Sequence, residues 1–202
     1  LAQKYGAVVI SPEYRLAGEA PYPAALNDCY AALCWMNDHT EELSIRPDQL
    51  IVGGESAGGG LAAATCLYAR DQGKIKIAMQ IPLYPMLDCE DTPSSADNHG
   101  KVWDTKRNHK GWAAYLGDLY GTDRVPKYAS PSRETDYAGL PPCYTYVLDG
   151  EPFYNETLTY VENLRRAGVD AHIDVFHGDI HAFVAADKLP FRSEERRVGK
   201  EC

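Results

Sequence analysis

Short apolar runs rich in β-branched residues alternate along the chain with longer stretches of helical periodicity. The short runs predict five strands, at residues 6–11, 49–53, 77–83, 143–148 and 171–176. The longer stretches predict helices at 23–39, 57–70 and 156–167, and a shorter helix that begins near His181. Such alternation is typical of β-α units, so we expect an α/β fold with a mostly parallel sheet and flanking helices.

One stretch, at about 88–142, interrupts this pattern. It is rich in Asp, Asn, Thr, Pro and Tyr, and its helical candidate, around 110–116, is modest. Segments of this length without regular structure are uncommon in compact domains and are often functional lids. We therefore predict a lid-like insertion, in which Trp103, Trp112 and Tyr115 either line a substrate pocket or pack within the lid.

Both ends of the chain differ from those of an ordinary domain. The first residues lack an initiator Met and a signal-peptide pattern and run directly into an apolar segment, which predicts a start within a domain. Residues 192–202 resemble one reading frame of a common sequencing adapter, and we interpret them as a non-native tail. The predicted domain is therefore a partial one over 1–191.

Composition narrows the possible partners. Acidic residues outnumber basic ones, 29 to 20, for a net charge of −9, which disfavours nucleic acid as a partner. No apolar run reaches the roughly 18 to 20 residues that cross a bilayer. The six cysteines form no Cys-x-x-Cys pair, which favours free thiols in a reducing, cytoplasmic compartment. Without metal-ligand spacing, we expect neither a metal nor an organic cofactor.

The pentapeptide at 54–58, Gly-Glu-Ser-Ala-Gly, carries the first chemical signal. Alone it is weak, because a Gly-x-Ser-x-Gly motif arises by chance in roughly one chain of this length in fifteen. Here an apolar strand precedes it and a helix of small residues follows, which is the setting of a nucleophile elbow. We therefore predict Ser56 as a nucleophile, with flanking glycines because the turn leaves little room.

A serine nucleophile needs a base, and the base needs a carboxylate that orients it. In a nucleophile-elbow fold the chain order is serine, acid, histidine. His177 and His181 both follow the last predicted strand, and His181 is favoured because it opens a predicted helix. For the acid, Asp149 and Glu151 both follow the strand at 143–148, and the residues alone leave the choice between them near even.

Several segments together resemble the hormone-sensitive-lipase-like esterases, of the acetyl esterase type. These segments are 13–17 (EYRLA), 23–26 (PAAL), 54–61 (GESAGGGL), 83–85 (LYP) and 151–156 (EPFYNE). The resemblance extends from residue 1 to about residue 189. It implies an α/β-hydrolase fold and a serine esterase that acts on short-chain acyl esters, acetylated sugars among them.

The resemblance also selects the acid. Residues 151–156 correspond to a run that begins with aspartate in the family, so Glu151 takes the acid position although it departs from the usual residue. The implied triad is Ser56, His181 and Glu151, with Asp149 as the alternative acid. A serine peptidase of the same fold and a non-catalytic binding relative are the alternative functions, although no peptidase-type pocket is indicated and all three triad residues are present.

The family also carries a His-Gly-Gly-Gly oxyanion loop upstream of the residues that match 5–11, and this chain begins after it. The remaining oxyanion donor that can be named is the backbone N–H of Ala57. Loss of one such donor typically lowers the rate by about 10² to 10³. We therefore expect the N-terminal strands and the oxyanion loop to be missing and this chain by itself to be inactive.

Overall fold

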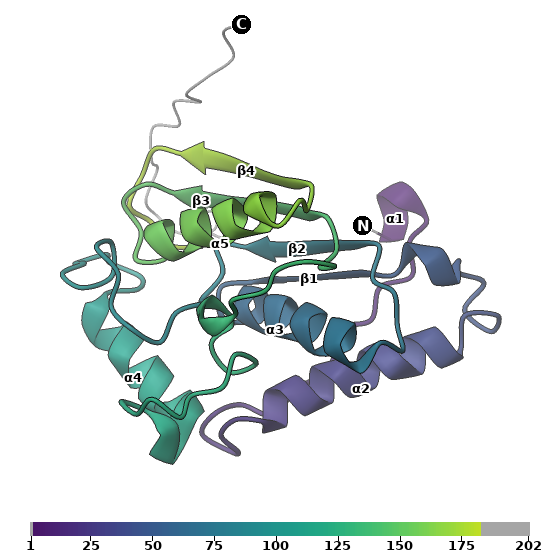
Figure 1. Cartoon of the computed structure of the whole chain (residues 1–202), viewed down its shortest axis with the longest axis horizontal. Coiled ribbons are helices and arrows are strands. Elements are labelled where there is room, and N and C mark those ends of the chain that lie inside the picture. Colours follow the sequence, from purple (N-terminus) through teal and green to yellow (C-terminus); the bar gives the residue numbers. More distant parts are fainter. Residues whose placement is uncertain (1, 183–202) are drawn as a thin grey trace, which may run out of the picture.

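The computed structural model describes residues 2–182, and its centre is a parallel sheet. The strands are β1 (Ile51–Glu55), β2 (Met79–Leu83), β3 (Cys143–Leu148) and β4 (Ala171–Phe176), in the order β1-β2-β3-β4. Every neighbouring pair is parallel. The carboxyl ends of all four strands therefore lie along one edge of the sheet, which is the edge where the arrowheads point in Figure 1. The predicted α/β-hydrolase fold is confirmed.

Helices flank this sheet. They are α1 (Ala2–Tyr5), α2 (Ala24–Asp38), α3 (Ala57–Gln72), α4 (Thr105–Leu116) and α5 (Tyr154–Arg166), with short 3-10 turns η1 (Pro47–Gln49), η2 (Gly117–Leu119) and η3 (Pro131–Arg133). The three longer helices predicted from the sequence are present as α2, α3 and α5. The helix predicted from His181 falls mostly outside the described residues, and so does the predicted tail at 192–202.

The main core lies between the sheet and two of these helices. Helix α3 covers β1 and β2, α5 covers β3 and β4, and α2 packs on α3 (Figure 1). Alanines at 62–64 on α3 are at most 4% exposed, so this helix can approach the sheet closely. Leu67 on α3 and Leu164 on α5 are fully buried in the same cluster, which shows that both helices cover one face.

The predicted strand at residues 6–11 is not a strand in the structure. This segment has no regular secondary structure, Val8 and Val9 are exposed, and it belongs to no ladder of the described sheet. A groove of about 420 Å³ lies beside it, lined by Val9 and Ile10 and by the edge strand β1. Ile51 on β1 is 54% exposed. An apolar sequence indicates strand propensity, but a strand also needs a neighbouring strand to pair with. Here the groove separates residues 6–11 from the edge strand β1.

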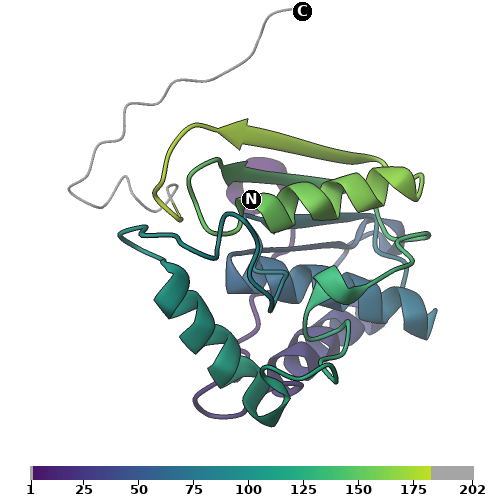
Figure 2. The same ribbon diagram turned by 60° about the vertical axis from the view of Figure 1, so that its left-hand side comes forward.

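The insertion contains more regular structure than its sequence indicates. Helix α4 begins at Thr105, five residues before the helical candidate, and the side chain of Asp104 caps it by accepting from the N–H of Arg107 at 2.7 Å. Figure 2 shows α4 at the end of the sheet where the strands finish. Trp112 and Leu116 on α4 are 3% exposed and pack in one cluster with Phe153, which follows β3. The insertion is thereby attached beside the carboxyl ends of the strands.

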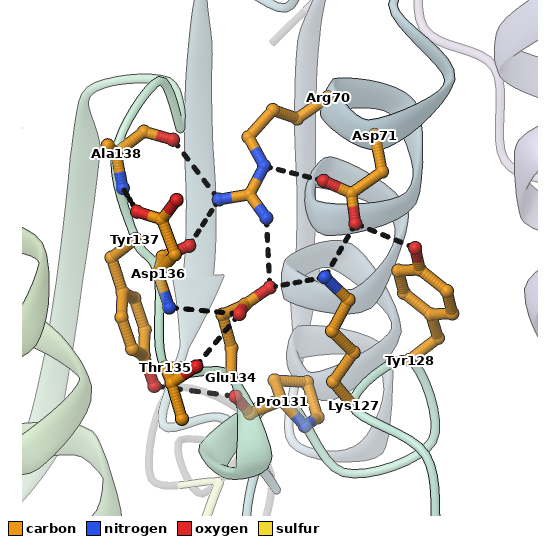
Figure 3. A network of polar contacts seen from close by, with 10 residues as sticks. All are labelled: Arg70, Asp71, Lys127, Tyr128, Pro131, Glu134, Thr135, Asp136, Tyr137 and Ala138. Atoms are coloured by element: carbon orange, nitrogen blue, oxygen red, sulfur yellow. Dashed lines mark hydrogen bonds and ion pairs between the residues drawn. The ribbon is translucent and has the colours of Figure 1, made fainter.

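A polar network joins the far part of the insertion to the C-terminal end of α3 (Figure 3). Glu134, with a side chain 4% exposed, accepts hydrogen bonds from Arg70 and Lys127, each at 2.8 Å. Asp71 contacts the same Lys127 at 2.7 Å and accepts from the hydroxyl of Tyr128. Two cations and two carboxylates therefore alternate, so that each charge faces an opposite one.

Glu134 is also held by the backbone. Its Oε1 accepts from the N–H groups of Thr135 at 2.8 Å and Asp136 at 3.0 Å. Burial opposes ionisation of this carboxyl, but the hydrogen bonds from Lys127, from these N–H groups and from Arg70 outweigh it and hold the pKa of Glu134 at about 2. The carboxylate is therefore stabilised by the fold at neutral pH.

We expect Glu134→Gln to lower the free energy of unfolding by about 2 kcal/mol at pH 7, because it removes the charge that Arg70 and Lys127 face. The folded pKa lies below the usual 4.5, so this contribution is present above about pH 4.5 and is lost as the pH falls toward 2. Urea unfolding at pH 7 and pH 3 measures it.

The matched control is Asp48→Asn, which breaks an equally short ion pair with Arg46 at 2.8 Å whose side chains are 66% and 63% exposed. Water screens such an exposed pair, so little change in the free energy of unfolding is expected. A similar decrease in the free energy of unfolding for both variants would contradict the stabilising role of Glu134. So would a decrease for Glu134→Gln that is as large at pH 3 as at pH 7.

None of the helices within residues 2–182 combines the length and the hydropathy needed to cross a membrane.

Candidate active site

Ser56 occupies the sharp turn between β1 and α3. Its backbone has φ 56° and ψ −120°, in the left-handed region that a non-glycine residue rarely adopts. Its N–H donates to the carbonyl of Leu83 at 3.0 Å, and its own carbonyl accepts from Met86 N–H and Gly60 N–H, both at 3.0 Å. The strained conformation is thus held by the segment after β2, as expected of a nucleophile elbow.

The glycines around Ser56 do not all serve the same purpose. A Cβ on Gly54 would lie 2.3 Å from the carbonyl oxygen of Gly58, and one on Gly60 would lie 2.1 Å from that of Met86. A Cβ on Gly58 would meet nothing within 4 Å. The prediction that both flanking glycines answer a lack of room holds for Gly54 and is wrong for Gly58, where side-chain space is free.

His181 lies over Ser56. Its Nε2 is 2.7 Å from the Ser56 hydroxyl oxygen, and the residue is 5% exposed. Three aromatic rings surround the imidazole: Phe153 and Tyr84 meet it edge-on at centroid distances of 5.0 and 5.1 Å, and Trp103 lies at 6.4 Å. The ring is therefore fixed in position by packing as well as by hydrogen bonds.

Glu151 contacts the other side of the imidazole. Its Oε2 is hydrogen-bonded to Nδ1 of His181, and its Oε1 accepts from the N–H of Leu148 at 2.9 Å. The residue is 1% exposed. A carboxylate at Nδ1 holds the proton on that nitrogen, so Nε2 is left free to accept the proton of the serine hydroxyl.

The two alternative residues, Asp149 and His177, pair with each other instead. Asp149 Oδ2 lies 2.8 Å from Nδ1 of His177, and Oδ1 accepts from Gly178 N–H at 3.1 Å. Burial opposes it, but these hydrogen bonds lower the pKa of Asp149, and the same contact raises the pKa of His177. Neither residue contacts Ser56 in the described structure, so this pair ties together the loops after β3 and β4.

Ala57 is the first residue of α3 and is exposed beside Ser56. Backbone N–H groups at the start of a helix face outward, and the helix dipole favours negative charge there. The position therefore suits a donor to an oxyanion that forms on a carbonyl attacked by Ser56.

Two of the aromatic neighbours of His181 were not predicted from the sequence. Tyr84, 1% exposed, donates its hydroxyl hydrogen to Glu55 at 2.8 Å while its ring contacts the imidazole. Phe153 is fully buried. Both residues stand in segments that carried the family resemblance, 83–85 and 151–156. The resemblance was the one signal in the sequence that could have pointed to them. Trp103 faces His181, whereas Trp112 and Tyr115 pack within the insertion and against Tyr22.

Within residues 2–182, no group of three or more His, Cys, Asp or Glu side chains is arranged to hold a metal ion.

A hydroxyl, an imidazole and a carboxylate in sequence, at the carboxyl ends of parallel strands, form the arrangement that performs acyl transfer. Fold and site together define the α/β-hydrolase class of protein. A family model described as alpha/beta hydrolase fold matches residues 1–185, and the chain belongs to this family. The resemblance to the hormone-sensitive-lipase-like esterases is thereby confirmed.

Several proteins similar to this chain are named as esterases or ester hydrolases. Esterase LipI of Mycobacterium tuberculosis is 33% identical over 196 residues, which cover 96% of this chain and 61% of the relative. An ethyl acetate hydrolase of Pseudomonas putida is 26% identical and covers 98% of this chain and 63% of the relative. Among solved structures, a bacterial heroin esterase is 40% identical with a TM-score of 0.84 and covers 88% of this chain and 58% of its own. The chain thus spans about three-fifths of the length of these relatives.

Proposed function

We propose that the protein is a serine carboxylesterase whose nucleophile is Ser56, whose base is His181 and whose orienting acid is Glu151. The observation that carries the proposal is the continuous contact from hydroxyl to imidazole to carboxylate, with 2.7 Å between Ser56 Oγ and His181 Nε2. The names of the relatives, which are esterases, support the same reaction.

In the proposed reaction, Ser56 Oγ attacks the ester carbonyl carbon while its proton passes to Nε2 of His181. The carbonyl π electrons move to the oxygen, which Ala57 N–H stabilises by donating a hydrogen bond. The carbonyl then re-forms, the alcohol leaves with the proton from His181, and an acyl-Ser56 ester remains. Water, deprotonated by the same nitrogen, attacks this ester and releases the carboxylic acid and the free serine.

Glu151 has a separate role in this reaction. Its carboxylate holds Nδ1–H of His181, so the imidazole presents an unprotonated Nε2 to the serine, and it stabilises the imidazolium that forms during attack. Burial at 1% exposure strengthens this interaction, because water cannot screen it.

We further propose that the acyl group is short, of the acetyl type. The partly exposed ring of Trp103 lies 6.4 Å from the imidazole of His181, beside the buried rings of Tyr84 and Phe153, and bulky rings at this position leave room for a small acyl group. The name of one relative, an ethyl acetate hydrolase, points to the same class of substrate.

The test uses protein expressed from the complete reading frame and a series of p-nitrophenyl esters from acetate to octanoate. Expected results are turnover that is fastest on the shortest esters and labelling of Ser56 by a fluorophosphonate, identified by mass spectrometry. Turnover of amide substrates with no ester preference would favour a serine peptidase. Absence of both turnover and labelling would favour a non-catalytic binding protein and defeat the proposal.

Trp103 is expected to limit the length of the acyl or alcohol group. Its Nε1–H donates to Asn108 at 3.3 Å, and its ring packs where a Cβ on Gly111 would come within 3.2 Å, so the indole is held in place. We expect Trp103→Ala to raise the ratio of kcat/KM for hexanoate over acetate esters by roughly 10-fold, since pocket contacts of this size discriminate by about 10 to 200.

Trp35→Ala is the matched control, because Trp35 is 45% exposed on α2 and is absent from the ring contacts of His181. Its hexanoate-to-acetate ratio is expected to equal that of the unmodified protein. An unchanged ratio in Trp103→Ala as well would show that the indole does not bound the substrate.

A further inference from the structure

A second buried carboxyl lies close to the site, on the first turn of α5. Glu156 is 2% exposed, and its Oε1 accepts from the N–H of Leu87 at 2.6 Å and from that of Asp88 at 3.3 Å. Its Oε2 has no hydrogen-bond partner among the described residues. Such a group costs free energy to bury, so its retention in the core calls for a physical reason.

The backbone that Glu156 binds supports the nucleophile. Met86, immediately before Leu87, donates its N–H to the carbonyl of Ser56 at 3.0 Å and lies against Gly60. Leu87 in turn accepts from the N–H of Ser132 at 3.1 Å. The segment 86–88 is therefore fixed on one side by the elbow, and Glu156 fixes it on another.

Helix α5 is continuous with the turn that carries the acid. Tyr154, its first residue, donates its N–H to the carbonyl of Glu151 at 3.3 Å, and Glu151 N–H donates to the carbonyl of Leu148. A displacement of α5 relative to segment 86–88 would therefore move Glu151 and His181 relative to Ser56. Within the described residues, these two hydrogen bonds of Glu156 are the ones that join α5 directly to segment 86–88.

We propose that Glu156 is a positioning residue: by accepting from Leu87 N–H and Asp88 N–H, it sets the distance between the nucleophile elbow and the turn that bears Glu151. The expected effect of Glu156 on the reaction rate rests on the proposed esterase function. The expected effect on the position of segment 86–88 rests on the hydrogen bonds alone. A misplacement of about 1 Å can cost roughly 10² in rate, so the effect is measurable.

The buried setting of Glu156 disfavours a negative charge on its carboxyl. Burial raises its pKa well above the usual value, and the negative charges of Asp88 and Glu151 add to this, against the opposing hydrogen bonds from Leu87 and Asp88. The carbonyl oxygen of a neutral carboxyl can accept a hydrogen bond from an N–H group, and so can the amide oxygen of glutamine.

The test compares Glu156→Gln, which keeps the acceptor, with Glu156→Met, which keeps the volume and removes it. For Glu156→Gln we expect kcat within about 3-fold of the unmodified protein and the same pH profile. For Glu156→Met we expect kcat for p-nitrophenyl acetate to fall roughly 10- to 100-fold with KM within about 2-fold. Hydrogen exchange at the Leu87 and Asp88 amides should quicken in Glu156→Met and not in Glu156→Gln.

Glu162→Gln, which removes a carboxylate that is 61% exposed on the same helix, is the control and should leave all these values unchanged. Equal kinetics and exchange in the Gln and Met variants would overturn the inference, as would a pH profile shifted by Glu156→Gln. If the unmodified protein hydrolyses no ester, the proposed function fails by itself. Exchange at the two amides then decides the positioning role, and unchanged exchange in Glu156→Met overturns it.

Discussion

Replacement of Ser56 by alanine is expected to lower kcat/KM for p-nitrophenyl acetate by roughly 10⁴- to 10⁶-fold. Without the hydroxyl, His181 has no proton to accept at 2.7 Å, and hydrolysis must proceed by direct attack of water. The elbow itself should persist, because its hydrogen bonds to Leu83, Met86 and Gly60 all use backbone atoms. Circular dichroism and thermal unfolding should therefore match those of the unmodified protein.

Ser44→Ala is the control for this substitution. Ser44 also has a positive φ, 54°, but it is exposed on the loop after α2. Its replacement tests whether an alanine in a left-handed conformation alone reduces activity, and no reduction is expected. Hydrolysis that survives Ser56→Ala at more than about a tenth of the original rate would place the nucleophile elsewhere and remove the basis of the esterase proposal.

Glu151→Gln is expected to have the second largest effect, a fall in kcat of roughly 10² to 10⁴. The amide keeps the shape of the carboxylate but loses its charge, so the imidazolium is no longer stabilised and the wrong tautomer of His181 becomes accessible. KM should change little, since Glu151 is buried at 1% exposure beneath the imidazole. Steady-state kinetics on p-nitrophenyl acetate separates kcat from KM.

Asp149→Asn is the matched comparison, since Asp149 lies two residues away and also pairs with a histidine, His177. Loss of the Asp149 carboxylate should weaken the contact that holds the loop after β4. We expect kcat to stay within about 5-fold of the unmodified protein. If Asp149→Asn alone abolishes turnover, the assignment of the acid to Glu151 is wrong.

Much of the fold could be predicted from the sequence, because α3, α5, β3 and β4 have consistent local patterns. The segment at 6–11 has the same apolar pattern and still forms no strand, because ladder formation depends on a neighbour that local composition does not encode. Helix α4 began earlier than its apolar residues indicate, because its start is set by the cap at Asp104 rather than by hydrophobic periodicity.

For the site, chain order and position favoured His181, and the residues alone left Asp149 and Glu151 near even. Both carboxyls follow the same strand and differ by two positions, so their directions depend on the conformation of a turn. The family resemblance made that selection, which stays a prediction until the variants are measured. Glu156 also stands in the resembling segment 151–156, but its role could not be predicted from the sequence, because it depends on contacts with backbone N–H groups 68 and 69 residues away.

The contact between Ser56 and His181 spans 125 residues of sequence, and β2 and β3 lie between the strands that carry them. Contacts of such high sequence separation form late in folding, because the loop-closure entropy must be overcome before they contribute. The hydroxyl and the imidazole therefore meet only when the whole sheet has assembled. Turnover consequently reports on the last stage of folding. Partly folded molecules with native-like helices would show no turnover.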